Sequence, residues 1–307
     1  MITRNTARRG FTLVELLLSL IVTAIVGGAL VRMVVSQARF MDQQEAWRSA
    51  RSVSRSGINR LMSDLRAVEA TNGVTAAVAG GQDFTIRVPY AFGILCRVNA
   101  NVTTVSLLPV DSAMFAEPGY TGFAWRKNST GVYTYVPGNA LPSFPGPNDC
   151  LNALPLGYQG NVAAPFAITT LPSINGSPAG QVVNLTSAAG LVAPPLGPEV
   201  GSIVFLYRSV RYEFKNSVEV PGRIGLWRTL VSTGGTEELV APFANTARVN
   251  FYVLNTTAPQ AAVPGTLGDI RGLELVLDGM SEQTPGGSTA PKTASVRTSV
   301  FFENRPD

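Results

Sequence analysis

The chain has 307 residues, 45% apolar and 14% charged, and this composition excludes a largely disordered protein. It has no histidine and only two cysteines, which excludes catalysis by an imidazole base and a thiolate zinc site. The net charge of +4 depends on three arginines in the first ten residues, without which 21 basic residues face 20 acidic ones, so overall charge gives no argument for nucleic-acid binding.

A long apolar segment begins directly after these arginines. Residues 11–31 carry a single charge, Glu15, and as a helix they would span about 32 Å, enough to cross a hydrocarbon core of about 30 Å. The preceding arginines predict a cytoplasmic N-terminus and an exported remainder. A carboxylate in such a segment is costly unless it lies near the headgroups or meets a cation.

The residues around Glu15 carry a recognisable motif. The run Arg9-Gly10-Phe11-Thr12-Leu13-Val14-Glu15 resembles the signal of type IV prepilins and type II secretion pseudopilins, which is a short basic leader followed by glycine, phenylalanine and a glutamate at the fifth mature position. An ordinary secretory signal would instead end at a small-residue cleavage site after its apolar stretch.

The resemblance implies a role for each residue of the motif. Residues 1–10 would be the leader, and a prepilin peptidase would cut after Gly10. Phe11 would then be the N-methylated terminus, and Glu15 would attract the Phe11 ammonium of a neighbouring subunit. Unpaired charges are costly in a water-poor helix bundle, so such a pair would specify register.

The helix is predicted to continue beyond the apolar segment, over residues 11–72, with its last turn near Ala70. An apolar face with helical spacing is formed by Ile58, Leu61, Leu65 and Val68. Arg60 and Asp64 have the spacing of an ion pair on the solvent face, and Asn72-Gly73 is a typical stop signal.

Three glycines interrupt the predicted helix. Gly27-Gly28 and Gly57 are weak points of a helix, because glycine costs about 1 kcal/mol relative to alanine. They favour either close helix–helix approach in the membrane or a bend where the helix leaves the lipid.

Residues 73–307 are predicted to form an exported β-rich domain. Strands are expected over residues 84–88, 102–108, 132–136, 203–208, 210–214, 224–231, 247–254, 270–277 and 294–302. Pro221-Gly222 favours a turn. The fold class is therefore α+β, an antiparallel sheet packed on the second half of a long helix.

Prolines and glycines concentrate in residues 137–198, which favours an extended loop region with a small strand over residues 181–185. This region is either an interaction surface or an insertion without a partner. Cys96 and Cys150 lie in the exported part, where a disulfide persists, and linking them would add about 4 kcal/mol of stability. Two buried free thiols are the alternative.

The sequence shows no motif of a catalytic, nucleotide-binding or metal site, so no cofactor and no enzyme activity are predicted. Asp269, Glu274 and Asp278 read as surface charges. A basic strip for nucleic acid could be formed by Arg208, Arg211, Arg223 and Arg228, although a solvated sheet face explains the same residues.

The C-terminal run 296–305, VRTSVFFENR, resembles the last strand of PilW-type minor pilins and of J-type minor pseudopilins. The predicted function is that of a minor pilin-like structural subunit, held in the bacterial inner membrane and then inserted into a type IV pilus beside other pilin subunits. The alternatives are a J-type pseudopilin of a type II secretion system, an anchored adhesin or DNA receptor, and an anchored enzyme.

Overall fold

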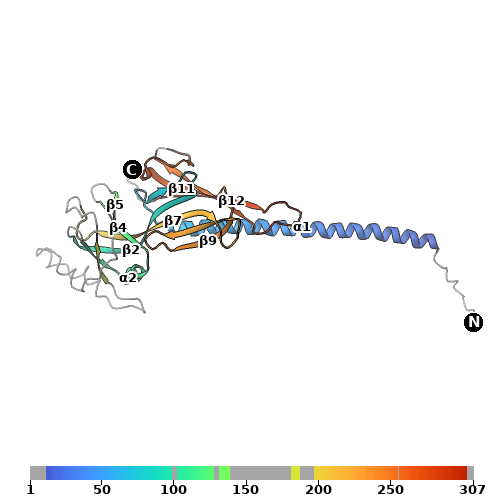
Figure 1. Ribbon diagram of the computed structural model, residues 1–307, viewed down its shortest axis with the longest axis horizontal. Helices are drawn as coiled ribbons and strands as arrows, with labels where there is room; N and C mark the ends of the chain where they lie inside the picture. The colour runs from blue at the N-terminus through green and yellow to red at the C-terminus, as the bar shows by residue number, and fades with distance from the viewer. Residues whose placement is uncertain are drawn as a thin grey trace, which may run out of the picture.

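The computed structural model of the protein describes residues 12–98, 102–127, 131–138, 181–186, 197–254 and 256–302. It confirms the α+β class: one long helix, α1 (Leu13–Leu65), and a β-rich domain packed on its second half (Figure 1). The first half of α1 projects away from the domain as a single straight rod. Gly10 and Phe11 lie outside the described residues.

The second half of α1 packs on the sheet through small side chains up to Gly57 and through leucines nearer its C-terminal end. Its buried positions recur every three or four residues, as one face of a helix requires, and they are Ala46, Ala50, Ser54, Gly57, Leu61 and Leu65. Gly57 allows especially close packing, because a Cβ there would lie 2.8 Å from Cζ of Phe243 and 3.0 Å from Cδ1 of Leu277. The helix is unbroken at Gly57, where the glycine packs against the sheet, and a bend there on leaving the lipid stays a prediction.

The helix ends at Leu65, earlier than the predicted last turn near Ala70. The amides of Ala67 and Val68 donate to the carbonyls of Asp64 and Leu65, which tightens the chain into a turn. Val68 and Ala70 are buried in this turn, so the predicted apolar face is confirmed although its last residue is not helical. Asn72 has a φ of 60°, and the chain reverses there into the sheet.

The sheet has twelve strands in the described part of the chain, all paired antiparallel. They are β1 (Val74–Ala77), β2 (Asp83–Val98), β3 (Val102–Leu107), β4 (Tyr120–Arg126), β5 (Tyr133–Pro137), β6 (Gln181–Thr186), β7 (Ile203–Asn216), β8 (Ile224–Leu230), β9 (Thr236–Phe243), β10 (Arg248–Val253), β11 (Ile270–Met280) and β12 (Thr293–Phe301). A short helix, α2 (Pro109–Ala116), and a 3-10 turn (Leu267–Asp269) complete the described elements.

Most predicted strands are confirmed, with two kinds of difference. The segments 203–208 and 210–214 form one strand, β7, because its backbone stays paired through Ser209 with Arg87 of β2. Strands β1, β4 and β9 and helix α2 were not predicted. The turn at Pro221-Gly222 is confirmed, with Gly222 at a φ of 80°.

Two large hydrophobic cores of the described residues lie along the sheet, joined by the long strands β2 and β7, and a smaller cluster contains Ala124, Phe205 and Tyr207. The core against α1 contains Leu61 and Leu65 of the helix with Phe84, Tyr212 and Leu275 of the sheet. The second core lies farther from the rod, under α2, and includes Leu95, Val105, Phe115, Phe123 and Leu206. The domain is thus fixed to the helix at one end, and its far end carries β4, β5 and α2 (Figure 1).

Candidate assembly interface

The first half of α1 is an apolar rod that the rest of the described chain leaves uncovered. Its most apolar 18-residue window has a mean hydropathy of 2.4 and no buried residue, and the helix is long and apolar enough to cross a membrane. Exposed apolar side chains on the rod include Leu13, Val14, Leu16, Leu17, Leu18, Leu20, Ile21, Val22, Ile25, Val26, Leu30, Val31, Met33, Val34 and Val35. A surface this apolar requires lipid or other helices around it.

The N-terminal end of this rod is capped by Thr12, and it carries Glu15, the residue predicted to pair with a neighbouring subunit. The hydroxyl of Thr12 accepts the backbone N–H of Glu15 at 3.3 Å, as an N-cap residue does. The Glu15 side chain is exposed, and no described residue forms an ion pair with it. Its carboxylate is therefore available to a cation that comes from outside the described chain.

Two hydroxyl groups within the rod bond to its own backbone. The hydroxyls of Ser19 and Thr23 donate to the carbonyls of Leu16 and Ser19, at 2.9 and 2.8 Å. The helix runs unbroken through Gly27-Gly28, and nothing lies within 4 Å of the position of a Cβ at either glycine. The two glycines thus leave this part of the rod without side-chain bulk, which is the feature that permits close approach of a second helix.

A charged network holds the other half of α1 to the sheet. The Tyr212 hydroxyl donates to Asp64 Oδ2 at 2.5 Å, and Arg228 Nε donates to the same oxygen at 3.2 Å. Arg228 Nη1 also reaches Glu237 Oε1 at 3.2 Å. Burial, and then the Asp64 carboxylate, raise the pKa of the Tyr212 hydroxyl well above its usual value. The predicted pairing of Asp64 with Arg60 on a solvent face is therefore wrong, because Asp64 faces the sheet.

The arginines of the predicted basic strip are mostly paired with carboxylates. Arg208 contacts Glu117 at 3.0 Å, and its guanidinium lies 4.0 Å from the centre of the Tyr90 ring. Arg211 contacts Asp83 at 2.6 Å. Since Arg228 is paired as well, three of the four arginines are neutralised, and the structure favours the interpretation as an ordinary sheet surface over a nucleic-acid site.

The acidic residues near the C-terminus and the two cysteines were the remaining candidates for a metal site or a disulfide. Glu274 accepts a hydrogen bond from Asn250 and Asp278 one from Thr246, and the described residues contain no group of three acidic, histidine or cysteine side chains able to hold a metal ion. Cys96 is buried, and no described cysteine is free. Cys150 lies outside the described residues, so its pairing with Cys96 stays a prediction.

Comparison with known proteins identifies the N-terminal segment. Residues 5–31 match the family model of the prokaryotic N-terminal methylation motif. No curated protein and no solved structure matches the chain. The matched segment contains Gly10, Phe11 and Glu15 and ends within the uncovered half of α1.

Proposed function

Because its N-terminal segment is that of a type IV prepilin-like or pseudopilin protein, we propose that the chain is a minor pilin-like structural subunit of a type IV pilus. Before assembly, the chain is held in the inner membrane with a cytoplasmic N-terminus and an exported sheet domain. A prepilin peptidase cuts it after Gly10, and its helix then inserts among those of other subunits. A single observation carries this proposal: the matched segment continues into a bare apolar half of α1, and the other half of the same helix packs on a folded domain.

Glu15 supplies the attraction that brings the rods into register. Within lipid or a helix bundle its carboxylate is costly unless a cation neutralises it. Cleavage after Gly10 creates such a cation, the Phe11 ammonium, at the end of every neighbouring rod. Each new subunit therefore gains stability when its terminus lies beside the Glu15 of a subunit already assembled.

Two measurements on the native protein test the proposal. The mass of the N-terminal peptide should be that of a chain that begins with methylated Phe11. Glu15→Ala and Glu15→Gln should leave this cleavage intact but lower incorporation into filaments by about tenfold, the effect of one lost pairing worth roughly 1.4 kcal/mol. The matched control Glu199→Ala, at an exposed position of the sheet domain, should assemble normally.

Opposite results would overturn each part separately. A mature chain that begins elsewhere than Phe11 would contradict the processing step. Normal incorporation of both Glu15 variants would contradict the pairing role. Recovery of the chain only in a secretion pseudopilus, with no chain in sheared surface pili, would favour the alternative of a J-type pseudopilin.

A further inference from the structure

The last strand of the sheet, β12, has one open edge. It pairs with β11 in a continuous register, from the pair of Met280 and Thr293 to the pair of Gly272 and Phe301, without a bulge. No other described strand pairs with β12. The outer strand of a sheet presents backbone N–H and C=O groups to which a further strand can bond.

The hydrogen bonds at the two ends of β12 show which of its residues face the open edge. The amide of Phe302 donates to the carbonyl of Arg271, and the amide of Ser281 donates to the carbonyl of Lys292, both at 2.9 Å. Bonded and non-bonded pairs alternate in antiparallel strands, so the even-numbered residues of β12 turn their backbone groups toward β11 and the odd-numbered ones turn theirs away. These outward residues are Thr293, Ser295, Arg297, Ser299 and Phe301.

The backbone groups of the outward residues are unpaired within the described chain. None of their amides or carbonyls forms a hydrogen bond with a described residue, and all five side chains are exposed. The edge thus presents five donors and five acceptors that alternate along the strand. An extended backbone is the partner whose own groups match this alternation.

The edge on the other side of β11 is closed by the chain itself. There Phe251 of β10 and Gln260 exchange two backbone hydrogen bonds, at 2.8 and 2.9 Å. The amide of Val249 in the same strand donates to the carbonyl of Gly81 at 2.8 Å. Proteins commonly protect edge strands by such covers, by prolines, by bulges or by several charges. Strand β12 has no proline, no bulge and a single charge, Arg297.

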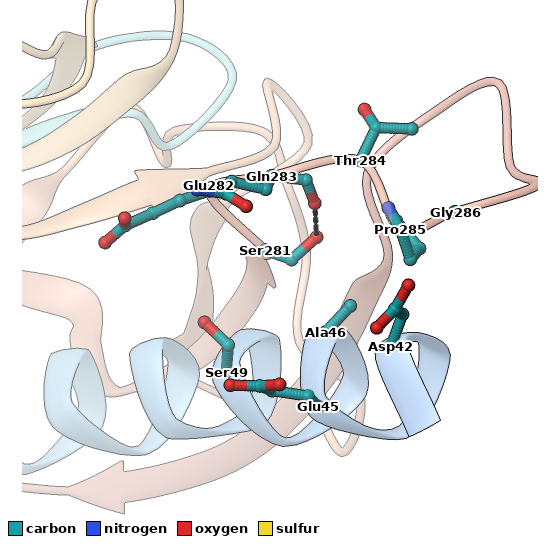
Figure 2. Close-up of a pocket in the computed structure, with 10 residues that line it drawn as sticks. All are labelled: Asp42, Glu45, Ala46, Ser49, Ser281, Glu282, Gln283, Thr284, Pro285 and Gly286. Carbon is teal, nitrogen blue, oxygen red and sulfur yellow. Dashed lines mark hydrogen bonds between the residues drawn. The ribbon is translucent and has the colours of Figure 1, made fainter. Parts of the chain in front are cut away.

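The loop before β12 turns toward the helix and fixes the start of the strand. Its residues 281–286 border a groove of about 390 Å³ together with side chains from residues 42–49 of α1. The buried Ser281 hydroxyl donates to the carbonyl of Gln283 at 2.7 Å (Figure 2) and accepts the amide of Lys292 at 3.0 Å. The open edge is therefore preformed, which lowers the cost of binding a partner there.

We propose that β12 binds an extended segment of a different polypeptide, which joins the sheet as one more strand. The segment runs antiparallel to β12, as β10 and β12 both do to β11. Backbone hydrogen bonds to the outward residues supply the affinity, and side chains on alternate positions supply the specificity.

Two exposed side chains of β12 define which segments fit. Arg297 lies at the centre of the edge and forms no ion pair with a described residue. Phe301 is 54% exposed, and its ring centre lies 4.8 Å from that of Tyr252. Directly opposite side chains interact across an antiparallel pair. The segment therefore carries a carboxylate opposite Arg297 and, four residues earlier, an apolar side chain opposite Phe301.

A second copy of this chain does not fit the edge when both copies span one membrane. Strand β12 runs from the loop beside residues 42–49 toward the end of the domain away from the rod (Figure 1). Two antiparallel β12 strands would be related by a twofold axis across the strands, which points their rods in opposite directions. This choice of occupant rests on the proposed function, because membrane insertion fixes the direction of the rod.

Binding of a designed peptide to the full chain in detergent tests the proposal. The probe is a blocked, fluorescent nine-residue peptide with valine at its first and even-numbered positions, glutamate at its fifth and threonine at the others. When it lies antiparallel, its fifth residue is opposite Arg297 and its first is opposite Phe301. A version with lysine at the fifth position should bind about fivefold more weakly, because attraction at one exposed pair becomes repulsion.

Backbone methylation of the probe separates strand pairing from general adhesion. The amides of its odd-numbered positions face β12, and those of its even-numbered positions face away. N-methylation at positions 3 and 7 should weaken binding about tenfold or more, since two hydrogen bonds are lost. N-methylation at positions 4 and 6 is the matched control and should change the Kd little. Equal Kd values for the two methylated peptides would overturn the proposal.

Substitution of the chain tests the role of Arg297. Arg297→Glu should reverse the preference, so that the lysine peptide binds about fivefold better than the glutamate peptide. The matched control Arg55→Glu, at an exposed position of α1, changes the net charge equally and should keep the original preference. An unchanged preference in Arg297→Glu would contradict the proposed specificity.

Amide hydrogen exchange of the unsubstituted chain locates the bound peptide, whatever the stability of the variants. A saturating amount of peptide should slow exchange at the outward residues of β12 about tenfold or more and leave the even-numbered residues, already bonded to β11, unchanged. Protection elsewhere, or dimers joined through β12 without peptide binding, would overturn the proposal. N-terminal masses of the same samples keep the two ideas apart: chains that begin at Phe11 but bind no peptide overturn the β12 contact alone, and chains that bind it but keep residues 1–10 overturn the proposed function.

Discussion

Ser54 joins the helix to two strands of the sheet through one buried hydroxyl. Its Oγ donates to the carbonyl of Ala294 in β12 at 2.8 Å and accepts the amide of Gly279 in β11, also at 2.8 Å. The close approach depends on Gly279, because a Cβ there would lie 2.4 Å from the Ala50 carbonyl oxygen. Ser54→Ala removes both hydrogen bonds without changing the fit of the helix against the strands.

The expected cost is about 2 kcal/mol of unfolding free energy. Two hydrogen bonds contribute about 0.5–1.5 kcal/mol each, and the buried backbone groups left behind add a desolvation penalty. The higher helix propensity of alanine offsets up to about 0.5 kcal/mol of this loss. For a domain of this size the loss corresponds to a decrease in Tm of about 4–8 °C.

Urea unfolding of the full chain in detergent, followed by tryptophan fluorescence, measures this cost. The matched control is Ser52→Ala, at an exposed position of the same helix, where alanine should be neutral or slightly stabilising. A loss below about 0.5 kcal/mol at Ser54, or an equal change at both serines, would refute the idea that this hydroxyl fixes the helix to the sheet.

Two further measurements concern the tyrosines of the sheet domain and the two cysteines of the chain. Burial raises the pKa of Tyr90 to about 12 and those of Tyr120 and Tyr212 further, whereas in the unfolded chain tyrosine titrates near pH 10. The stabilising effect is therefore complete below about pH 10 and declines as pH rises above it, because only the unfolded chain releases protons. The urea midpoint should decrease between about pH 10 and 11.5, less steeply in Tyr90→Phe, and a flat profile would contradict the burial argument. The unreduced mass of the native chain should show Cys96 and Cys150 joined, and alkylation of both thiols without reduction would contradict the disulfide.

Much of the helix and most strands could be predicted from sequence because their signals are local. An apolar run of membrane length, the spacing of Leu61 and Leu65, and alternation in segments such as 210–214 all depend on neighbours within a few residues. The assembly motif could be recognised for the same reason, since Gly10, Phe11 and Glu15 lie within six consecutive positions.

The contacts between helix and sheet could not be predicted, because they depend on residues distant in the chain. Ala50 and Ser54 give little hydrophobic signal, yet both are buried directly against Gly279 of the sheet, where their small size permits the close approach. Asp64 had an equally plausible partner in Arg60, and only the sheet brings Arg228 to it. Strand β9 was not predicted because its first three residues are polar, Thr236 and two glutamates, one of which pairs with Arg228.

The bond between Ser54 and Ala294 joins residues 240 positions apart in the sequence. A ribosome therefore delivers the helix long before it delivers the strand that covers it. Until the strands of the sheet have been synthesised, the buried stripe of the helix from Ala46 to Leu65 lacks the residues that cover it. Only a chain synthesised through β12 can therefore form the complete contact between helix and sheet. A truncated chain has the same N-terminal segment but lacks this contact.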